Sequence, residues 1–132
     1  MKTIPESHHD LLRDDKKAFV YLATLMPGGA PQVTPVWFNT DGTHILINTA
    51  EGRVKDHNMR ARPQVALCIA DPANPYRYLQ IRGSVVAETE EGAFDVICDL
   101  QVKYRGNRDY PKRPGEVRVT YKVQPEQVLA RG

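Results

Sequence analysis

Asn48-Thr-Ala-Glu-Gly-Arg-Val-Lys-Asp-His-Asn-Met-Arg-Ala-Arg-Pro63 is the stretch around which the rest of the chain is organised. It follows an apolar run, turns at Gly52, and enters a segment that favours a short helix until Pro63 ends it. A helix that begins near Arg53 or Val54 presents unpaired backbone N–H groups and the positive end of its dipole. Such a helix start is suited to binding an anion.

Two cationic side chains favour reading this turn as the phosphate anchor of a cofactor. Arg53 can hold a phosphate through two parallel N–H groups, and Lys55 adds a mobile point charge. Lys55 and Asn58 are three residues apart, so they would share one helix face with the phosphate. An ordinary amphipathic turn with solvated charges fits the same spacing equally well, because this is not one of the sharply defined phosphate motifs.

The overall composition predicts one domain, spanning residues 1–132. The chain is 41% apolar, which is enough for a single core at this length. The net charge of +2 is too small to predict nucleic-acid binding, but positive charge is concentrated in residues 53–62 and 103–118. Two local basic patches suit a small polyanionic ligand better than a long duplex, with a weak nucleic-acid surface as the alternative.

The sequence gives no reason to expect a membrane partner or a metal site. The N-terminus lacks an apolar signal region, and no stretch approaches membrane-spanning length. Cys68 and Cys98 lie far apart within apolar patterns, which is typical of buried reduced thiols. No pair of the four histidines has ligand spacing together with a carboxylate or thiol companion. We therefore expect a cytoplasmic protein without a bound metal.

Strand patterns account for most of the chain. The predicted strands cover residues 18–25, 32–38, 44–48, 64–70, 76–88 and 117–123. Besides the anchor helix, short helices are expected after Ser7 and over residues 93–104, with Ser7 and Thr89 as N-caps and Gly106 as the C-terminal stop. Six short strands with tight turns predict a mainly β fold with small helices, in the form of a closed or partly closed antiparallel barrel.

The first two predicted strands carry further information. Pro35 cannot donate to a ladder, so its strand lies at an edge or is bulged. This interruption leaves backbone groups of Thr34, Val36 and Trp37 available to a flat ligand, with a plain edge strand as the equal alternative. The strand at residues 18–25 is apolar on both faces and needs a covering layer, which a homodimer supplies most simply.

An ordered set of short motifs extends over nearly the whole chain. The motifs are Ser7-His8-x-Asp10-Leu-Leu12, Ala23-Thr24-Leu25, Pro31-Gln-Val-Thr-Pro-Val-Trp-Phe38, Asn48-Thr-Ala-Glu-Gly-Arg-Val-Lys55, Asn58, Pro63, Asp71-Pro-x-Asn-Pro-Tyr-Arg-Tyr78, Arg82-Gly83 and Lys103-Tyr104-x-Gly106. Each motif is weak alone, but the ordered set is specific. With it the chain resembles the pyridoxamine-phosphate-oxidase-like split β-barrel family, and most of all its branch of small deazaflavin (coenzyme F420)-dependent reductases.

The resemblance implies a six-stranded antiparallel split β-barrel of the FMN-binding type, assembled as a homodimer with two cofactor grooves between the protomers. It places the ring-contacting strand on residues 32–37. The partner chain would close each groove, and we expect Tyr76, Tyr78 or Arg118 to contribute to that closure.

The resemblance also implies where the phosphate anchor lies. It places the anchor on Arg53, Lys55 and Asn58, with Thr49 beside it. The full set of predicted cofactor-binding residues is Gln32, Thr34, Pro35, Val36, Trp37, Asn48, Thr49, Gly52, Arg53, Lys55, Asn58 and Tyr78.

The activity implied by the resemblance is hydride transfer between coenzyme F420 and a flat, conjugated small-molecule acceptor. The cofactor would carry the chemistry, while the protein orients it and excludes water, so no catalytic residue is assigned. A basic loop at Lys112 and Arg113 would hold the polyglutamate tail of the deazaflavin. FMN is the alternative cofactor, because related members bind it through a similar phosphate grip. A non-catalytic carrier of flavin, deazaflavin or haem is the alternative from a different class.

Overall fold

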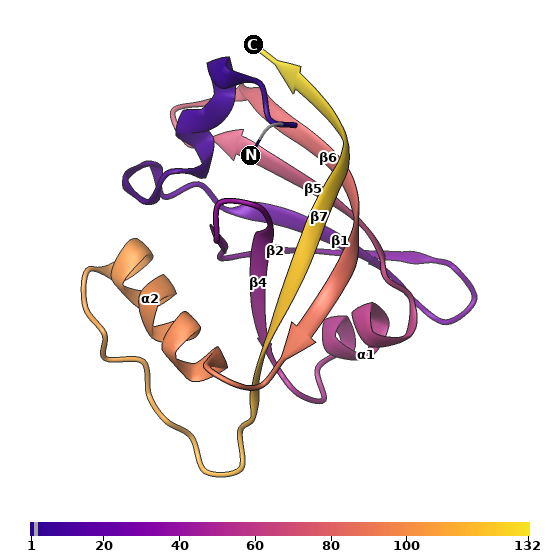
Figure 1. Cartoon of the computed structure of the whole chain (residues 1–132), viewed down its shortest axis with the longest axis vertical. Coiled ribbons are helices and arrows are strands. Elements are labelled where there is room, and N and C mark those ends of the chain that lie inside the picture. Colours follow the sequence, from indigo (N-terminus) through magenta and orange to yellow (C-terminus); the bar gives the residue numbers. More distant parts are fainter. Residues whose placement is uncertain (2) are drawn as a thin grey trace.

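The computed structural model describes residue 1 and residues 3–132, which form a strongly curled sheet with short helices around it (Figure 1). Along the chain the elements are the 3-10 helices η1 (Glu6–Leu12) and η2 (Asp14–Lys16), then β1 (Val20–Leu25), β2 (Pro31–Val36), β3 (Asn39–Thr40), β4 (Ile45–Ala50), α1 (Val54–Ala61), β5 (Gln64–Asp71), β6 (Asn74–Thr89), α2 (Ala93–Arg105) and β7 (Arg118–Arg131). None of the helices in the described part of the chain has the length and apolar character that crossing a membrane requires.

The seven strands form one antiparallel sheet in the order β2-β1-β5-β6-β7-β4-β3. The long strands β6 and β7 lie near its middle, and β2 and β3 are its two edges. Since these edges are not paired with one another, the sheet is a curled half-barrel and not a closed barrel. Helix α1 connects β4 on one side of the long strands to β5 on the other.

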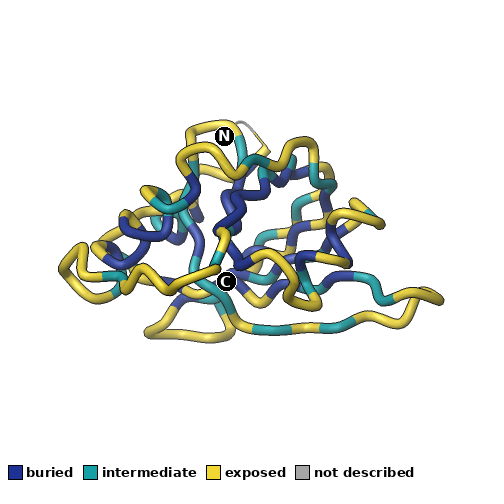
Figure 2. The backbone as a smooth tube through the Cα atoms, turned by 90° about the horizontal axis from the view of Figure 1, so that it is seen from below, coloured by how far each residue is buried: buried dark blue, intermediate teal, exposed yellow. Residues whose placement is uncertain are grey.

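The concave side of the sheet holds the core. Residues directly opposite one another on paired strands point to the same face, and the row Leu22, Leu67 and Ile81 is almost fully buried. Figure 2 shows that the buried stretches lie inside the fold and that the outer loops are exposed. Buried residues alternate with more exposed ones along β1 and β5. This period of two explains why the strand pattern was readable from the sequence.

The predicted number of six strands is wrong, and so is the predicted end of the last strand. The predicted second strand ends at Val36. Asn39 and Thr40 form a separate short strand, β3, which pairs with β4. Strand β7 continues through Pro125 to Arg131. It does so because the ladder shifts register between Arg82 and Gly83, which places Gly83 opposite the proline. This irregularity is a β-bulge at Gly83, where a Cβ would overlap the carbonyl oxygen of Gln124.

Both predicted N-caps are wrong, whereas the predicted helix stop is confirmed. The first helix is a 3-10 helix with Pro5 at its N-cap, and the Ser7 hydroxyl lies 2.8 Å from Nδ1 of His8. Gly92 precedes α2, while the Thr89 hydroxyl accepts a hydrogen bond from the Glu91 amide in the turn before it. Gly106 ends α2 with a φ of 82°, a conformation that favours glycine.

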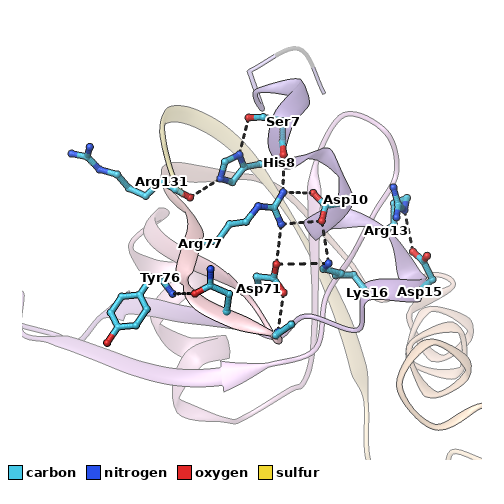
Figure 3. A network of polar contacts seen from close by, with 12 residues as sticks. Ser7, His8, Asp10, Arg13, Asp15, Lys16, Asp71, Tyr76, Arg77 and Arg131 are labelled. Atoms are coloured by element: carbon cyan, nitrogen blue, oxygen red, sulfur yellow. Dashed lines mark hydrogen bonds and ion pairs between the residues drawn. The ribbon is translucent and has the colours of Figure 1, made fainter.

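A cluster of ion pairs, which we call the N-terminal clasp, joins the first helices to the β5–β6 hairpin (Figure 3). It consists of Asp10, Lys16, Asp71 and Arg77. The guanidinium of Arg77 lies 2.6 Å from Asp10 and 3.0 Å from Asp71, and it also donates to the Ser7 carbonyl. Next to the clasp, Nε2 of the buried His8 lies 2.7 Å from the Arg131 carbonyl oxygen, which ties the same helix to the end of β7.

The last turn of α2 is fastened to the segments around β1 and β2 by two polar side chains, the buried Lys103 and the half-buried Tyr104. Nζ of Lys103 donates to the Phe38 carbonyl at 2.7 Å, and the Tyr104 hydroxyl donates to the Ala18 carbonyl at 2.6 Å. Burial lowers the pKa of Lys103 to about 8 and raises the pKa of Tyr104 to about 12. Both contacts connect α2 to residues more than 60 positions earlier.

Candidate functional site

The predicted anchor turn lies between β4 and α1. Gly52 has a φ of 96°, a conformation that side-chain-bearing residues rarely adopt, and Arg53 is the N-cap of α1. The predicted helix start near Arg53 or Val54 is therefore confirmed, as is the helix end before Pro63. Local signals were sufficient here, because glycine and proline mark the two ends of the helix.

The backbone N–H groups of this turn are only partly available to an anion. The Gly52 amide donates to a carboxylate oxygen of Asp56 at 3.0 Å, and the Arg53 amide donates to the Ala50 carbonyl at 3.3 Å. The amides of Val54 and Lys55 have no acceptor within the described part of the chain. The expectation of free N–H groups holds for Val54 and Lys55 and is wrong for Gly52 and Arg53.

Two cations stand at this helix start without a carboxylate partner. Within residues 1 and 3–132, no carboxylate lies within 4.0 Å of the charged groups of Arg53 or Lys55. Burial lowers the pKa of Lys55, and the nearby charge of Arg53 lowers it further. A bound phosphate would offset the repulsion between the charges of Arg53 and Lys55, and its oxygens would accept hydrogen bonds from the amides of Val54 and Lys55. The arrangement therefore suits an anion.

The hydroxyl of Thr49, at the end of β4, is a further group without a partner. The residue is 1% exposed, and its oxygen has no hydrogen-bond partner among the described residues. Buried hydroxyls normally have a partner, so an orphaned one next to the anchor turn is compatible with a group that the chain alone does not supply.

The side chain of Asn58 is buried within the protein. It is 1% exposed, and its amide donates to the Thr24 hydroxyl at 3.0 Å and contacts the Met26 sulfur at 3.3 Å. Its oxygen accepts a hydrogen bond from Arg62. The side chain therefore fastens α1 to the end of β1, and a direct contact with phosphate stays a prediction.

Asn48 also uses its side chain inside the protein. Its amide donates to the Ala93 carbonyl at 2.8 Å and to the Thr120 hydroxyl, and its oxygen accepts from Arg118 at 2.9 Å. Arg118 is buried and also contacts Tyr110 and Glu116. Its guanidinium is thus occupied within its own chain, whereas Tyr76 is 84% exposed and Tyr78 is half-buried.

The predicted ring-contacting strand is mostly β2, an edge strand as Pro35 indicated. Among the described residues β2 pairs only with β1, so the backbone groups on its other side have no strand partner there. Gln32 approaches the Thr24 hydroxyl at 3.5 Å, while Thr34 and Val36 are half-buried.

Trp37 follows β2 and stacks on α2, a contact that the sequence analysis missed. Its ring lies 5.0 Å from that of Tyr104, which stacks in turn on Phe19 at 5.3 Å. Tyr104 lies at the end of the helix predicted over residues 93–104. No local signal identified its two aromatic neighbours, because they lie in segments remote from α2.

The larger concave regions do not join the anchor to β2 within one chain. One, of about 470 Å³, lies on the convex side of the sheet and includes Ala23, Pro31, Ala66 and Arg82. Another lies beside Gly52 and Asp56 and contains no residue of β2. A ligand that touches both predicted halves of the site would therefore extend across open surface of a single chain.

Comparison with known proteins shows similarity along the whole chain. The family model described as pyridoxamine 5'-phosphate oxidase matches residues 4–132. Among curated proteins, none matches the chain. A solved structure of an F420 reductase from Mycobacterium smegmatis is 33% identical, with a TM-score of 0.83, and the match covers 96% of this chain and 98% of that one.

More distant solved structures share the fold alone. A putative pyridoxamine 5'-phosphate oxidase from Listeria innocua is 20% identical, with a TM-score of 0.73 and 95% of each chain covered. HutZ from Vibrio cholerae, described as a haem storage protein, is 16% identical, with a TM-score of 0.68 and coverage of 96% of this chain and 94% of that one.

Proposed function

The chain belongs to the pyridoxamine 5'-phosphate oxidase family, and from this premise we propose that it is a coenzyme F420-dependent oxidoreductase. It would transfer a hydride between the deazaflavin and a conjugated organic acceptor. The observation that carries the proposal is the similarity to an F420 reductase over nearly the full length of both chains.

The β4–α1 junction supports the proposal because its groups fit a phosphate. Two cations, two backbone amides and the Thr49 hydroxyl all lack partners within the described residues. Arg53 and Lys55 would hold the phosphate of the cofactor, with the amides of Val54 and Lys55 pointing to its oxygens. Together these residues would fix one end of the cofactor relative to the sheet.

The bound deazaflavin would supply a ring that accepts and donates hydride, and the chain's own residues would position that ring. The unpaired backbone edge of β2 could hydrogen-bond the ring heteroatoms, as predicted for Gln32 to Trp37. The aromatic stack of Trp37 on Tyr104 would keep that end of the strand rigid. No side chain is assigned as a proton donor.

We further propose that the groove is completed by a second copy of the chain. The convex side of the sheet is apolar along β1 and β2, where Tyr21 is 47% and Val33 65% exposed, and Leu129 on β7 is 42% exposed. The register of the sheet places Tyr21, Cys68, Gln80 and Leu129 in one row of this face. Covering it would bury apolar surface and close the open site from the partner's side.

The basic loop between α2 and β7 would contact the acidic tail of the deazaflavin. The ammonium of Lys112 lies 5.5 Å from the Phe94 ring centre and, among the described residues, has no carboxylate within 4.0 Å. Arg113 has Glu116 at 3.7 Å. Lys112 is therefore the better candidate, and its contribution should decrease with added salt.

FMN is the second candidate cofactor. The unpaired cations and amides of the anchor recognise a phosphate and do not distinguish a deazaflavin from a flavin. The family model is also that of pyridoxamine 5'-phosphate oxidase. In this case the purified protein would carry a yellow chromophore, and the tail-binding contribution of Lys112 would be absent.

Titration of the purified protein with F420, FMN and haem tests these alternatives. We expect F420 to bind most tightly, and Lys55→Ala to weaken it by roughly 10- to 100-fold, the loss of one charge-assisted hydrogen bond. Lys122→Ala, which removes the same charge from a side chain paired with Asp41, serves as the control. Tighter binding of FMN would favour the flavin enzyme, and binding of haem alone would favour the carrier. F420 affinity that is indifferent to Lys55→Ala would show that the anchor is misassigned.

Light scattering after size exclusion tests the proposed assembly. We expect the mass of two chains at micromolar concentration. A single chain at all concentrations up to those of the binding experiments would contradict the completed groove.

A further inference from the structure

A buried carboxylate lies directly beneath the anchor turn and belongs to none of the predicted site residues. Asp56 is 1% exposed, yet its carboxylate receives three hydrogen bonds. The donors are the Gly52 amide at 3.0 Å, the Tyr121 hydroxyl at 2.5 Å and a guanidinium N–H of Arg60 at 3.1 Å. We call these four residues the Asp56 cluster.

Asp56 determines the shape of the anchor turn through its bond to Gly52. It is the third residue of α1, and its side chain folds back past the N-cap to the glycine, as an acidic residue does in a capping box. The Gly52 amide is therefore not available to donate a hydrogen bond to an anion. With the Arg53 amide held by Ala50, the next open amides are those of Val54 and Lys55.

Tyr121 connects this turn to the sheet. It is fully buried in β7, opposite Ile47 of β4, and its hydroxyl also lies 3.2 Å from the Asp56 carbonyl oxygen. One hydroxyl therefore fixes both the backbone and the carboxylate of Asp56. The first turn of α1 is held against a rigid strand and not only by its own helical bonds.

Arg60 connects the cluster to a third strand. Its guanidinium binds Asp56 and lies 3.2 Å from a carboxylate oxygen of Glu88 in β6. Burial raises the pKa of Asp56, but the bonds from Tyr121, Gly52 and Arg60 outweigh it and leave this pKa below its ordinary value. The carboxylate is therefore ionised at neutral pH, which is the state that accepts all three bonds.

We propose that the Asp56 cluster is the positioning element of the phosphate site, with Tyr121 and Asp56 fixing the turn that aims the Val54 and Lys55 amides at the anion. None of the cluster's side chains touches the phosphate in this proposal. It rests on the proposed cofactor function, and it deepens that function by assigning residues that act through the turn.

The phosphate dependence of binding distinguishes positioning from general support of the fold. A loss of general support weakens binding of the whole cofactor, whereas a misplaced anchor weakens only the part contributed by the phosphate. The quantity to measure is the affinity ratio between a cofactor and its phosphate-free analogue. Suitable pairs are F420 with its deazaflavin nucleoside, and FMN with riboflavin.

Tyr121→Phe is the principal variant, because it removes one oxygen and keeps the packing of the ring. We expect the affinity ratio to fall about tenfold, near the value of one hydrogen bond to a charged group, with the affinity for the phosphate-free analogue changed less than about twofold. Asp56→Asn is the second variant, since it keeps the shape and an acceptor for Gly52 while removing the charge. Tyr104→Phe is the matched control, because it also removes a tyrosine hydroxyl that donates a hydrogen bond inside the protein but lies at the far end of α2. Any effect of Tyr104 on the ring-contacting strand alters the affinities for the cofactor and for its phosphate-free analogue alike, so the ratio should be unchanged.

Amide NMR of the wild-type protein with inorganic phosphate gives a test that needs neither a variant nor a cofactor. Phosphate should shift the amide signals of Val54 and Lys55, while the Gly52 signal stays in place because Asp56 retains its hydrogen. A Gly52 signal that moves first would show that Asp56 does not hold the turn, and it would overturn the proposal.

The outcomes separate this inference from the function on which it rests. If Lys55→Ala lowers the affinity ratio and neither Tyr121→Phe nor Asp56→Asn does, the positioning role is overturned and the cofactor function stands. If neither cofactor binds but phosphate shifts Val54 and Lys55 in the wild type, less so in Tyr121→Phe, the cofactor function fails and the positioning role stands. If phosphate shifts no amide of this turn and neither cofactor binds, both fail.

Discussion

The N-terminal clasp and the Asp56 cluster are both built from a carboxylate and an arginine, but they differ in their access to water. In the clasp, the side chains of Asp10 and Arg77 are 23% and 20% exposed, and four charged groups share the ion pairs. In the Asp56 cluster the carboxylate is 2% exposed and two of its three donors are uncharged. The hydrogen bond from Arg77 lowers the pKa of Asp10, and Asp56 is also below its ordinary pKa.

This difference indicates which of the two regions tolerates change. Water and salt can replace part of what an exposed ion pair contributes, and such pairs have small net effects. A buried carboxylate that loses a donor has no water to replace it, so the full cost of desolvation appears. The contribution of the N-terminal clasp to stability should therefore depend on water and salt, whereas the contribution of the Asp56 cluster should not.

The largest effect is expected from Asp56→Ala. The change removes the carboxylate that accepts from the Gly52 amide and leaves the buried Tyr121 hydroxyl with its longer contact to the backbone carbonyl of residue 56, so we expect it to lower the free energy of unfolding by about 2–3 kcal/mol. Urea denaturation followed by fluorescence measures this loss, which should be the same at low salt and in 0.5 M NaCl, where the Debye length is roughly 4 Å. A loss that disappears in salt would mean that the cluster is not shielded from water.

Arg77→Gln in the clasp should have a smaller effect that depends on salt. It removes the ion pairs to Asp10 and Asp71 but keeps a polar side chain at a partly exposed position. We expect a lower melting temperature than in the wild type, with the difference shrinking as salt is added. Differential scanning calorimetry at two salt concentrations measures it, and a difference as large as that of Asp56→Ala at both would remove the distinction between the regions.

Acid titration should show a still smaller effect. Both carboxylates have lowered folded-state pKa values, so their stabilisation is present above the unfolded pKa of about 3.9 and is lost as the pH falls toward the folded values. Melting temperatures between pH 5 and pH 3 should therefore fall less steeply in Arg77→Gln than in the wild type. Parallel curves for the two proteins would show that Arg77 does not set the pKa of Asp10.

The smallest effect is expected at the neighbouring pair of Arg13 and Asp15. Their side chains are 63% and 72% exposed, although their charged atoms lie 3.1 Å apart, closer than some contacts in the clasp. Arg13→Ala should leave the melting temperature within experimental error, because solvation competes with the pair. A measurable loss would mean that distance, and not exposure, decides the contribution of these ion pairs.

Local features of the sequence were sufficient to predict all the strands except the two-residue β3, the edge position of Pro35 and both ends of α1. Period-two patterns and single glycines or prolines act within a few residues, so they can be read directly. The length of β7 was missed because a proline such as Pro125 normally indicates the end of a strand. The strand continues through this proline because Gly83 lies opposite it in β6, and that pairing cannot be read from the sequence near Pro125.

The side-chain partners in the candidate site depended on contacts between distant segments and could not be predicted. Asn58 lies inward because Thr24 and Met26, more than 30 residues earlier, accept and contact its amide. In the sequence Asp56 is only an acidic residue within the basic stretch 53–62, because its partner Tyr121 is 65 positions away. The sequence thus located the anchor turn but not the groups that hold it.

The pairing of β4 with β7 has a consequence for how the chain is made. Asn48 and Thr120 are 72 residues apart in the sequence, yet their strands, β4 and β7, are direct neighbours in the sheet, and β7 is the last strand along the chain. During synthesis on the ribosome, β4 and β6 each have an unpaired edge until β7, which lies between them in the sheet, has been made. Folding should therefore be slow for the chain's size, and the ligand-binding turn should be among the last parts to reach its final form.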